Sequence, residues 1–566
     1  MSSEDHLAGH FAPDQYVKEL VPLMQPNDFT GEENPEIMLL ACRCLANMME
    51  ALPASTANVV YGGAVPVLCQ KLLEIHFIDL AEQALMTLEK ISAEFPASIV
   101  REGGLTACLT YLDFFATPTQ RTAVTTAANC CRNIPEDSFA TIRDVMPILL
   151  NVLGNSDQKV LEQGCLCVSR VVESFKYQDT KLEELVSADL LQAILRLLLP
   201  GTTNLIGPNI HTQFLRVLAI TARASPRRSV DLLKMNVVDT LYQILTGVSP
   251  PSGTDEIATK IDSVVIVQAL IHRPRDQIFE TLNVICELLP SVQRDDLTFL
   301  ADLFDAGYPG DNYASLAARS KESPNQKRVE MLEGCKEEVK RFAVVLLPTL
   351  TDAYSSTVNL SVRQKVLTAH LKMLSNFDTA ILEDSLRSVP YASFLAAILS
   401  QQDHSTLVTF ALQAAELLLK RLESIYRYQF HREGVIAEIT KLAGRPCKSL
   451  EDKPKAAKVL PESAEPVRLA ESSRATDTSL EDAEEDDAEA RDENDGSVNE
   501  EDENEEQDND DNPEDDDESD SSSSSGRRYK GEPQLPDIDD IITLRAKKFM
   551  EAHTKEDSKG MSRKAA

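Results

Sequence analysis

An apolar helical pattern recurs about every 40 residues in the first part of the chain and ends each time just before a proline. These prolines are Pro53, Pro96 and Pro135. Proline lacks a backbone N–H and its ring clashes with the preceding helical turn, so each one should end a helix. Two further matches share the period: Glu82-Gln83 with Glu162-Gln163, and Tyr61-Gly-Gly with Glu102-Gly-Gly. Repeats of about 40 to 47 residues built from two or three helices are typical of armadillo and HEAT proteins.

A single unit of this kind cannot bury its own apolar face, so neighbouring units must stack and share a core. Such a stack presents a long concave surface suited to binding another protein. The sequence therefore predicts an all-α, armadillo/HEAT-like superhelical solenoid over residues 13–443, preceded by a flexible leader at 1–12.

The chain changes character after residue 443. We expect a polar linker at 444–480, an acidic and serine-rich disordered tract at 481–525, and a tail at 526–566 with a short helix near 538–550. Residues 481–520 contain 25 acidic side chains and one basic side chain, Arg491, so most of the formal charge of -35 lies there. Such a segment cannot bury enough apolar surface to fold alone.

Composition excludes several classes of partner. Nucleic-acid binders carry a clustered basic face, which this chain lacks, and it has no tryptophan to stack on bases. No apolar run reaches the roughly 20 residues needed to cross a bilayer. We expect no nucleic-acid or membrane partner, and a location in the nucleus, the cytoplasm or both.

No motif predicts catalysis, so we expect no catalytic, cofactor-binding or metal-binding residues and no cofactor. Phosphate-binding glycine loops, nucleophile elbows and paired zinc-binding histidines are all missing from the sequence. Free cysteine on an apolar helix face behaves as a small buried hydrophobe, which predicts core positions and a reducing compartment. This applies to Cys42, Cys44, Cys69, Cys108, Cys130, Cys131, Cys165, Cys167 and Cys286.

The concave surface carries the candidate binding residues. The third helix of an armadillo unit lines the groove, and side chains four positions apart share one face of it. Aligning the repeats on their prolines puts a row of cationic and amide side chains there, able to hold an extended peptide. An equally open reading is that these are ordinary solvated positions. The candidates are Arg43, Asn47, Lys90, Asn129, Arg170 and Arg216.

Several segments between residues 13 and 443 also resemble a known family. The matching runs include Met38-Leu-Leu-Ala-Cys-Arg, Ala81-Glu-Gln-Ala-Leu, Tyr111-Leu-Asp-Phe-Phe, Ala127-Ala-Asn-Cys-Cys, Ile285-Cys-Glu-Leu-Leu-Pro and Arg432-Glu-Gly-Val. They resemble the amino-terminal armadillo region of HECT-type E3 ubiquitin ligases of the ubiquitin-fusion-degradation family, of the thyroid-hormone-receptor interactor twelve type.

The resemblance implies a role in recognising substrates or ubiquitin for proteasomal degradation, with an E2 enzyme engaged only through a HECT domain. The residues after 443 are too few and too acidic for that domain, so no catalytic residue is carried over and enzymatic activity of this chain is left open. The alternatives are a stand-alone, non-catalytic armadillo adaptor or competitor, and an importin-alpha-like transport receptor. The chain's lack of tryptophan disfavours the latter.

Overall fold

The protein is a stack of three-helix repeats. The computed structural model describes residues 12–199, 205–250, 263–292, 324–401, 403–447 and 537–564, with side chains described to residue 554 in the last segment. The described residues contain α- and 3-10 helices and no strand. None of the described helices is long and apolar enough to span a membrane. The predicted all-α solenoid is confirmed, whereas the predicted acidic tract at 481–525 lies outside the described residues.

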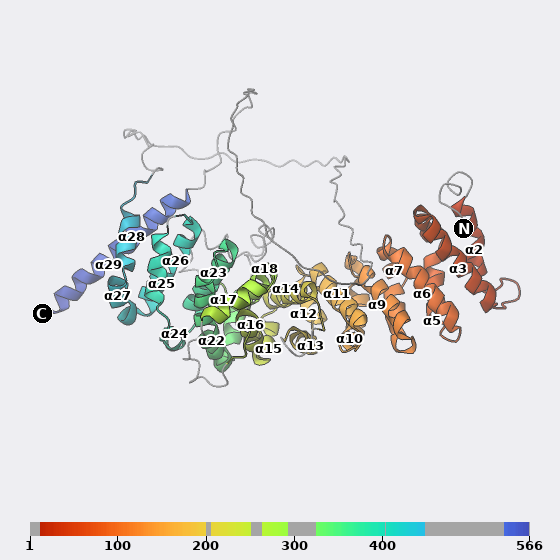
Figure 1. Ribbon diagram of the computed structural model, residues 1–566, viewed down its shortest axis with the longest axis horizontal. Helices are drawn as coiled ribbons and strands as arrows, with labels where there is room; N and C mark the ends of the chain where they lie inside the picture. Colours follow the sequence, from red (N-terminus) through yellow and green to blue (C-terminus); the bar gives the residue numbers. More distant parts are fainter. Residues whose placement is uncertain are drawn as a thin grey trace, which may run out of the picture. The chain divides into compact units, whose positions relative to one another are not determined.

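The third helices of the repeats form one continuous row, because each packs directly against the next (Figure 1). In chain order they are α3 (Pro35–Ala51), α6 (Ile78–Ser92), α9 (Thr117–Cys130), α11 (Gln158–Ser174), α14 (Pro208–Ala224), α18 (Arg275–Leu288), α23 (Leu360–Asn376), α26 (Ser405–Arg421) and α29 (Ile538–Lys564). We call this set the third-helix row.

The second helices form a parallel row beside it. They are α2 (Pro13–Leu23), α5 (Ala64–Leu73), α8 (Gly104–Thr110), α10 (Phe139–Val152), α13 (Ala188–Leu198), α16 (Val237–Thr246), α22 (Lys336–Ser355), α25 (Tyr391–Ser400) and α28 (Val435–Ala443). Each helix from α2 to α16 contacts its successor in this row, and α25 contacts α28.

Short first helices complete the units. They are η1 (Pro53–Ser55) with α4 (Thr56–Tyr61), α7 (Pro96–Arg101), η3 (Glu136–Ser138), α12 (Asp179–Leu185), α15 (Pro226–Lys234), α21 (Pro324–Glu333), α24 (Thr379–Leu386) and α27 (Glu423–Arg432). Two additional helices are η2 (Leu112–Phe114) and α17 (Ser263–His272).

The prolines mark the change from a third helix to the next first helix, as predicted. α3 ends at Ala51 and Pro53 opens η1, while α6 ends at Ser92 and Pro96 opens α7. Proline is accepted at the first helical position because that N–H has no partner within the helix.

The matched glycine motifs form the turn from a first helix to a second helix. Gly63, Gly103 and Gly434 have φ angles of 80°, 78° and 85°, the left-handed conformation that glycine adopts without strain. The late sequence Arg432-Glu-Gly-Val is therefore a repeat turn, and α27 and α28 open a last unit.

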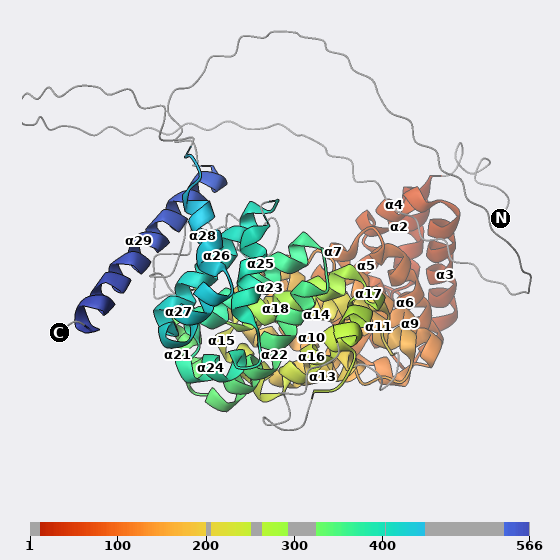
Figure 2. The ribbon, with the colours of Figure 1, turned by 60° about the vertical axis from the view of Figure 1, so that its left-hand side comes forward.

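The third helix of that last unit comes from the far end of the chain. α29 packs on both α26 and α28, as α6 packs on both α3 and α5 (Figure 2). Ile542, Ala546 and Phe549 are buried in this contact. The helix predicted near 538–550 is thus longer, at Ile538–Lys564, and is part of the stack.

The cysteines follow the core prediction with one correction. Eight of the nine cysteines predicted to be buried are so, whereas Cys44 is exposed. It lies two positions after buried Cys42, about 200° around α3 at 3.6 residues per turn, and so points away from the core. Burial raises the pKa of the Cys42 thiol to about 11, which keeps it protonated.

Candidate protein-binding surface

All six candidate residues lie on the third-helix row, but they differ in how they are used. Arg43 and Asn47, on α3, are exposed, whereas the other four are partly buried and contact the preceding third helix. Those contacts include Lys90 Nζ to Glu50 Oε2 (3.3 Å), Asn129 Nδ2 to Ser92 Oγ (2.9 Å) and Arg170 Nη1 to the Ala128 carbonyl oxygen (2.5 Å). These side chains therefore connect one repeat to the next.

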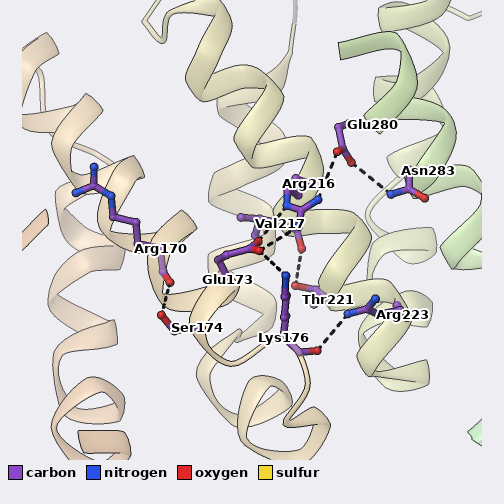
Figure 3. Close-up of polar contacts among 10 residues, drawn as sticks. All are labelled: Arg170, Glu173, Ser174, Lys176, Arg216, Val217, Thr221, Arg223, Glu280 and Asn283. Carbon is purple, nitrogen blue, oxygen red and sulfur yellow. Dashed lines mark hydrogen bonds and ion pairs between the residues drawn. The ribbon is translucent and has the colours of Figure 1, made fainter. Parts of the chain in front are cut away.

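Arg216 contacts the third helices on both sides of its own (Figure 3). Its Nε and Nη2 atoms donate to the two carboxylate oxygens of Glu173 on α11, both at 3.0 Å. Its Nη1 atom is 3.7 Å from Oε1 of Glu280 on α18. Lys176 adds a second cation on Glu173, at 2.7 Å. One guanidinium thus joins three successive third helices.

The charges in this cluster are balanced internally. Although burial opposes ionisation of Glu173, hydrogen bonds from Arg216 and Lys176 lower its pKa. Burial raises the pKa of Glu280, and this effect exceeds the opposing influence of Asn283 and Arg216. Burial, together with the nearby charge of Arg132, lowers the pKa of Arg170. Any acidic partner would have to compete with carboxylates already present in this part of the row.

The start of the row presents a different surface. Arg43 and Asn47 are exposed on α3, and Leu40 on the same helix is 58% exposed. Met86, on the adjoining α6, is 50% exposed. A cation and an amide beside apolar side chains can bind a peptide through both charge and apolar contact. Leu40 was missed because an apolar side chain in a helix resembles a core position, although its spacing of three from Arg43 puts it on the same exposed face. We call Leu40, Arg43, Asn47 and Met86 the α3–α6 patch.

A group of possible metal ligands lies at one edge of the first repeats. Ligand atoms of Glu33, Glu74 and His76 all lie within 4.8 Å of one another. The sequence did not predict this group, because the contact joins loops about 40 residues apart. Glu74 already accepts from the buried Nζ of Lys71 at 3.1 Å, which neutralises its charge and disfavours a bound cation.

Comparisons with known proteins confirm the resemblance noted from the sequence. Residues 2–101 match a family described as "E3 ubiquitin-protein ligase TRIP12-like, TPR repeats". The chain is 34% identical over 463 residues to E3 ubiquitin-protein ligase UPL3 of Arabidopsis thaliana, covering 79% of this chain and 23% of that protein. It is 32% identical over 489 residues to E3 ubiquitin-protein ligase TRIP12 of Danio rerio, covering 78% and 23%.

A third relative carries the pathway in its name. The chain is 30% identical over 441 residues to a probable ubiquitin fusion degradation protein of Schizosaccharomyces pombe, covering 78% of this chain and 24% of that protein. The chain therefore spans about a quarter of the length of these curated relatives. What is matched is a helical repeat region of this type of ligase.

Proposed function

We propose that this chain is the substrate-recognition armadillo region of a HECT-type E3 ubiquitin ligase in the ubiquitin-fusion-degradation pathway. The observation that carries the proposal is similarity over 78 to 79% of the chain to proteins named E3 ubiquitin-protein ligases. In this proposal the armadillo region binds substrate or ubiquitin, and a HECT domain outside this chain receives ubiquitin from an E2 and transfers it. We further propose a nuclear or cytoplasmic location.

The α3–α6 patch is the part of the third-helix row best suited to that binding. Lys90, Asn129, Arg170 and Arg216 already contact neighbouring helices, so a partner would gain little from them without breaking those bonds. Arg43 and Asn47 are exposed and lie near apolar Leu40 and Met86. An exposed mixture of this kind favours a peptide that combines an apolar side chain with an acidic one.

Binding of a non-cleavable linear ubiquitin fusion to the immobilised full chain tests the patch. We expect the double variant Arg43→Glu with Met86→Ala to weaken binding at least about tenfold, equivalent to about 1.4 kcal/mol. Arg387→Glu is the matched control, because Arg387 is exposed at the C-terminal end of first helix α24, away from the row. Unchanged binding in the double variant, or an equal loss in the control, would exclude this surface.

A stand-alone, non-catalytic adaptor or competitor is the alternative, and it differs by lacking a catalytic half. Full-length transcript reads and an immunoblot against the armadillo region distinguish the two. A native product much larger than 62.5 kDa that continues into a HECT domain supports the ligase. A product of 62.5 kDa supports the adaptor. The importin-alpha-like alternative has less support, because importin subunit alpha-2 of Arabidopsis thaliana is 27% identical over only 30% of this chain.

A further inference from the structure

Two histidines meet where the last repeat is completed by α29. His431 is exposed on α27, and His553 is buried on α29, 122 positions later. Their Nε2 atoms are 3.1 Å apart, and their ring centroids are 5.1 Å apart with a 39° angle between planes. Phe549 stacks on His553 with an interplanar angle of 22° and holds that ring in place. The lone pairs of two imidazoles from distant parts of the chain therefore converge.

This distance suits two kinds of chemistry. One neutral imidazole can donate its Nε2–H to the Nε2 lone pair of the other. Alternatively, both nitrogens can be ligands of one cation. Two Zn–N bonds of about 2.0–2.1 Å that open at the tetrahedral angle place their nitrogens about 3.3–3.4 Å apart. The observed separation of 3.1 Å corresponds to a narrower N–Zn–N angle, of about 98°.

We propose that His431 and His553 form a divalent transition-metal site that clamps α29 onto the last repeat. Imidazole nitrogen is a preferred ligand for Zn²⁺, Cu²⁺ and Ni²⁺. Within the described residues no third histidine, cysteine or carboxylate ligand atom joins the pair. Because His431 is exposed, solvent can reach the remaining positions.

The surroundings of the pair are compatible with a cation. His431 borders a hollow of about 560 Å³ on α27, lined also by Glu423, Ser424, Arg427 and Tyr428. The charge of Arg427 is compensated by Glu423, 2.9 Å away. On α29, Arg545 pairs with Glu416 about two turns before His553. Arg432, next to His431, is paired with Glu433 at 2.7 Å. Lys548, five positions before His553, is exposed and limits the affinity to a modest value.

A shared metal would change how firmly α29 is held. In the docked state the metal has two imidazole ligands from two helices, and when α29 detaches it can keep only one of them. The ion therefore stabilises the docked state by mass action, and the fraction of detached α29 falls about 100-fold at a free metal concentration 100 times the Kd. Completion of the last repeat then depends on metal supply.

The test uses the full chain purified without a polyhistidine tag. Zn²⁺ binding is measured by competition with a chromophoric chelator, and hydrogen exchange of residues 538–550 is measured in Zn²⁺ and in EDTA. We expect Zn²⁺ to slow this exchange at least about tenfold in the wild type. His431→Ala should lose one bound Zn²⁺ and the slowing, whereas the exposed control His272→Ala should lose neither.

Two outcomes would overturn the metal site. The first is unaltered Zn²⁺ binding in His431→Ala, which would leave the pair as a hydrogen bond only. The second is loss of the bound Zn²⁺ in His76→Ala alone, which would assign the ion to the group of Glu33, Glu74 and His76. His431→Ala is the decisive variant, because this side chain is exposed and its removal leaves the buried packing of α29 intact. Neither readout depends on ubiquitin transfer.

Discussion

Replacing Arg216 by methionine tests whether the inner part of the third-helix row is primarily structural. Methionine keeps the apolar stem of the arginine and removes the guanidinium. The variant breaks two 3.0 Å hydrogen bonds to Glu173 and the 3.7 Å pair with Glu280. It leaves two carboxylates, one on each of the helices that flank α14, without this cation.

The magnitude follows from exposure. Arg216 and Glu173 side chains are 30% and 43% exposed, so solvent screens their attraction to about 1 kcal/mol. Glu280 is only 11% exposed and loses a cation at 3.7 Å, which adds about 1 kcal/mol. We therefore expect the opening free energy of α14 and α18 to fall by about 1–2 kcal/mol, equivalent to roughly 5- to 30-fold faster exchange.

Hydrogen exchange of α14 and α18 is the suitable assay, because stacked repeats open locally rather than all at once. Adding Glu280→Gln should recover about half of the loss, since it removes the carboxylate left in the less exposed position. Exposed Arg43→Met should change exchange less than twofold. Exchange of Arg216→Met within twofold of the wild type would refute the structural role. A tenfold loss of ubiquitin-fusion binding without faster exchange would instead show that Arg216 contacts the partner directly.

Three further perturbations test other parts of the stack. Gly434→Ala puts a Cβ on a residue with a φ of 85° and should destabilise the α27–α28 turn by about 1 kcal/mol. The control Gly444→Ala, at a φ of -79°, should change the stability by less than half as much. Equal denaturation midpoints for the two variants would contradict this prediction. Arg545→Met removes the ion pair to Glu416 and should speed hydrogen exchange in α29 about 5- to 30-fold. Hydrogen exchange in the distant α3 should be unchanged. An effect shared by both helices would contradict a local role. Burial lowers the pKa of His370 to about 4, so this histidine stays neutral in the folded state while the unfolded chain binds a proton below about pH 6.5. The free energy of unfolding should therefore fall by up to about 3 kcal/mol between pH 6.5 and 4. In denaturation experiments, a His370→Phe variant should show a weaker pH dependence.

Local sequence signals were sufficient to locate the repeats. Proline ends helices by fixed covalent geometry, and glycine is required wherever the first-to-second turn has a positive φ, so both signals survive in a single sequence. For this reason the positions of Pro53, Pro96 and the Gly63 and Gly103 turns were predictable. The period also placed all six candidate residues on third helices.

The partners of those residues were not predictable from the period. Arg216 bonds to Glu173, 43 positions earlier, and lies 3.7 Å from Glu280, 64 positions later. Both pairings depend on how adjacent repeats are rotated and offset, which sequence spacing does not fix. A row that looks cationic in sequence is therefore largely neutralised by its neighbours in the fold. Peptide binding by the six residues stays a prediction. Arg43 and Asn47 are the two of the six that are exposed and so best able to contact a partner.

The position of α29 shows why the end of a solenoid is difficult to read from sequence. A repeat pattern identifies units whose helices follow one another closely, and the segment from residue 448 to 536 separates α28 from α29. Yet α27 and α28 alone would leave the apolar faces of α26 and α28 open, because a repeat buries its core only when its third helix is present. Helix α29 supplies Ile542, Ala546 and Phe549 to that face and pairs Arg545 with Glu416. Since this last helix is joined to its repeat through a long connection, its docking is an equilibrium that side-chain contacts must maintain, and the His431–His553 pair is placed where a bound cation would shift it.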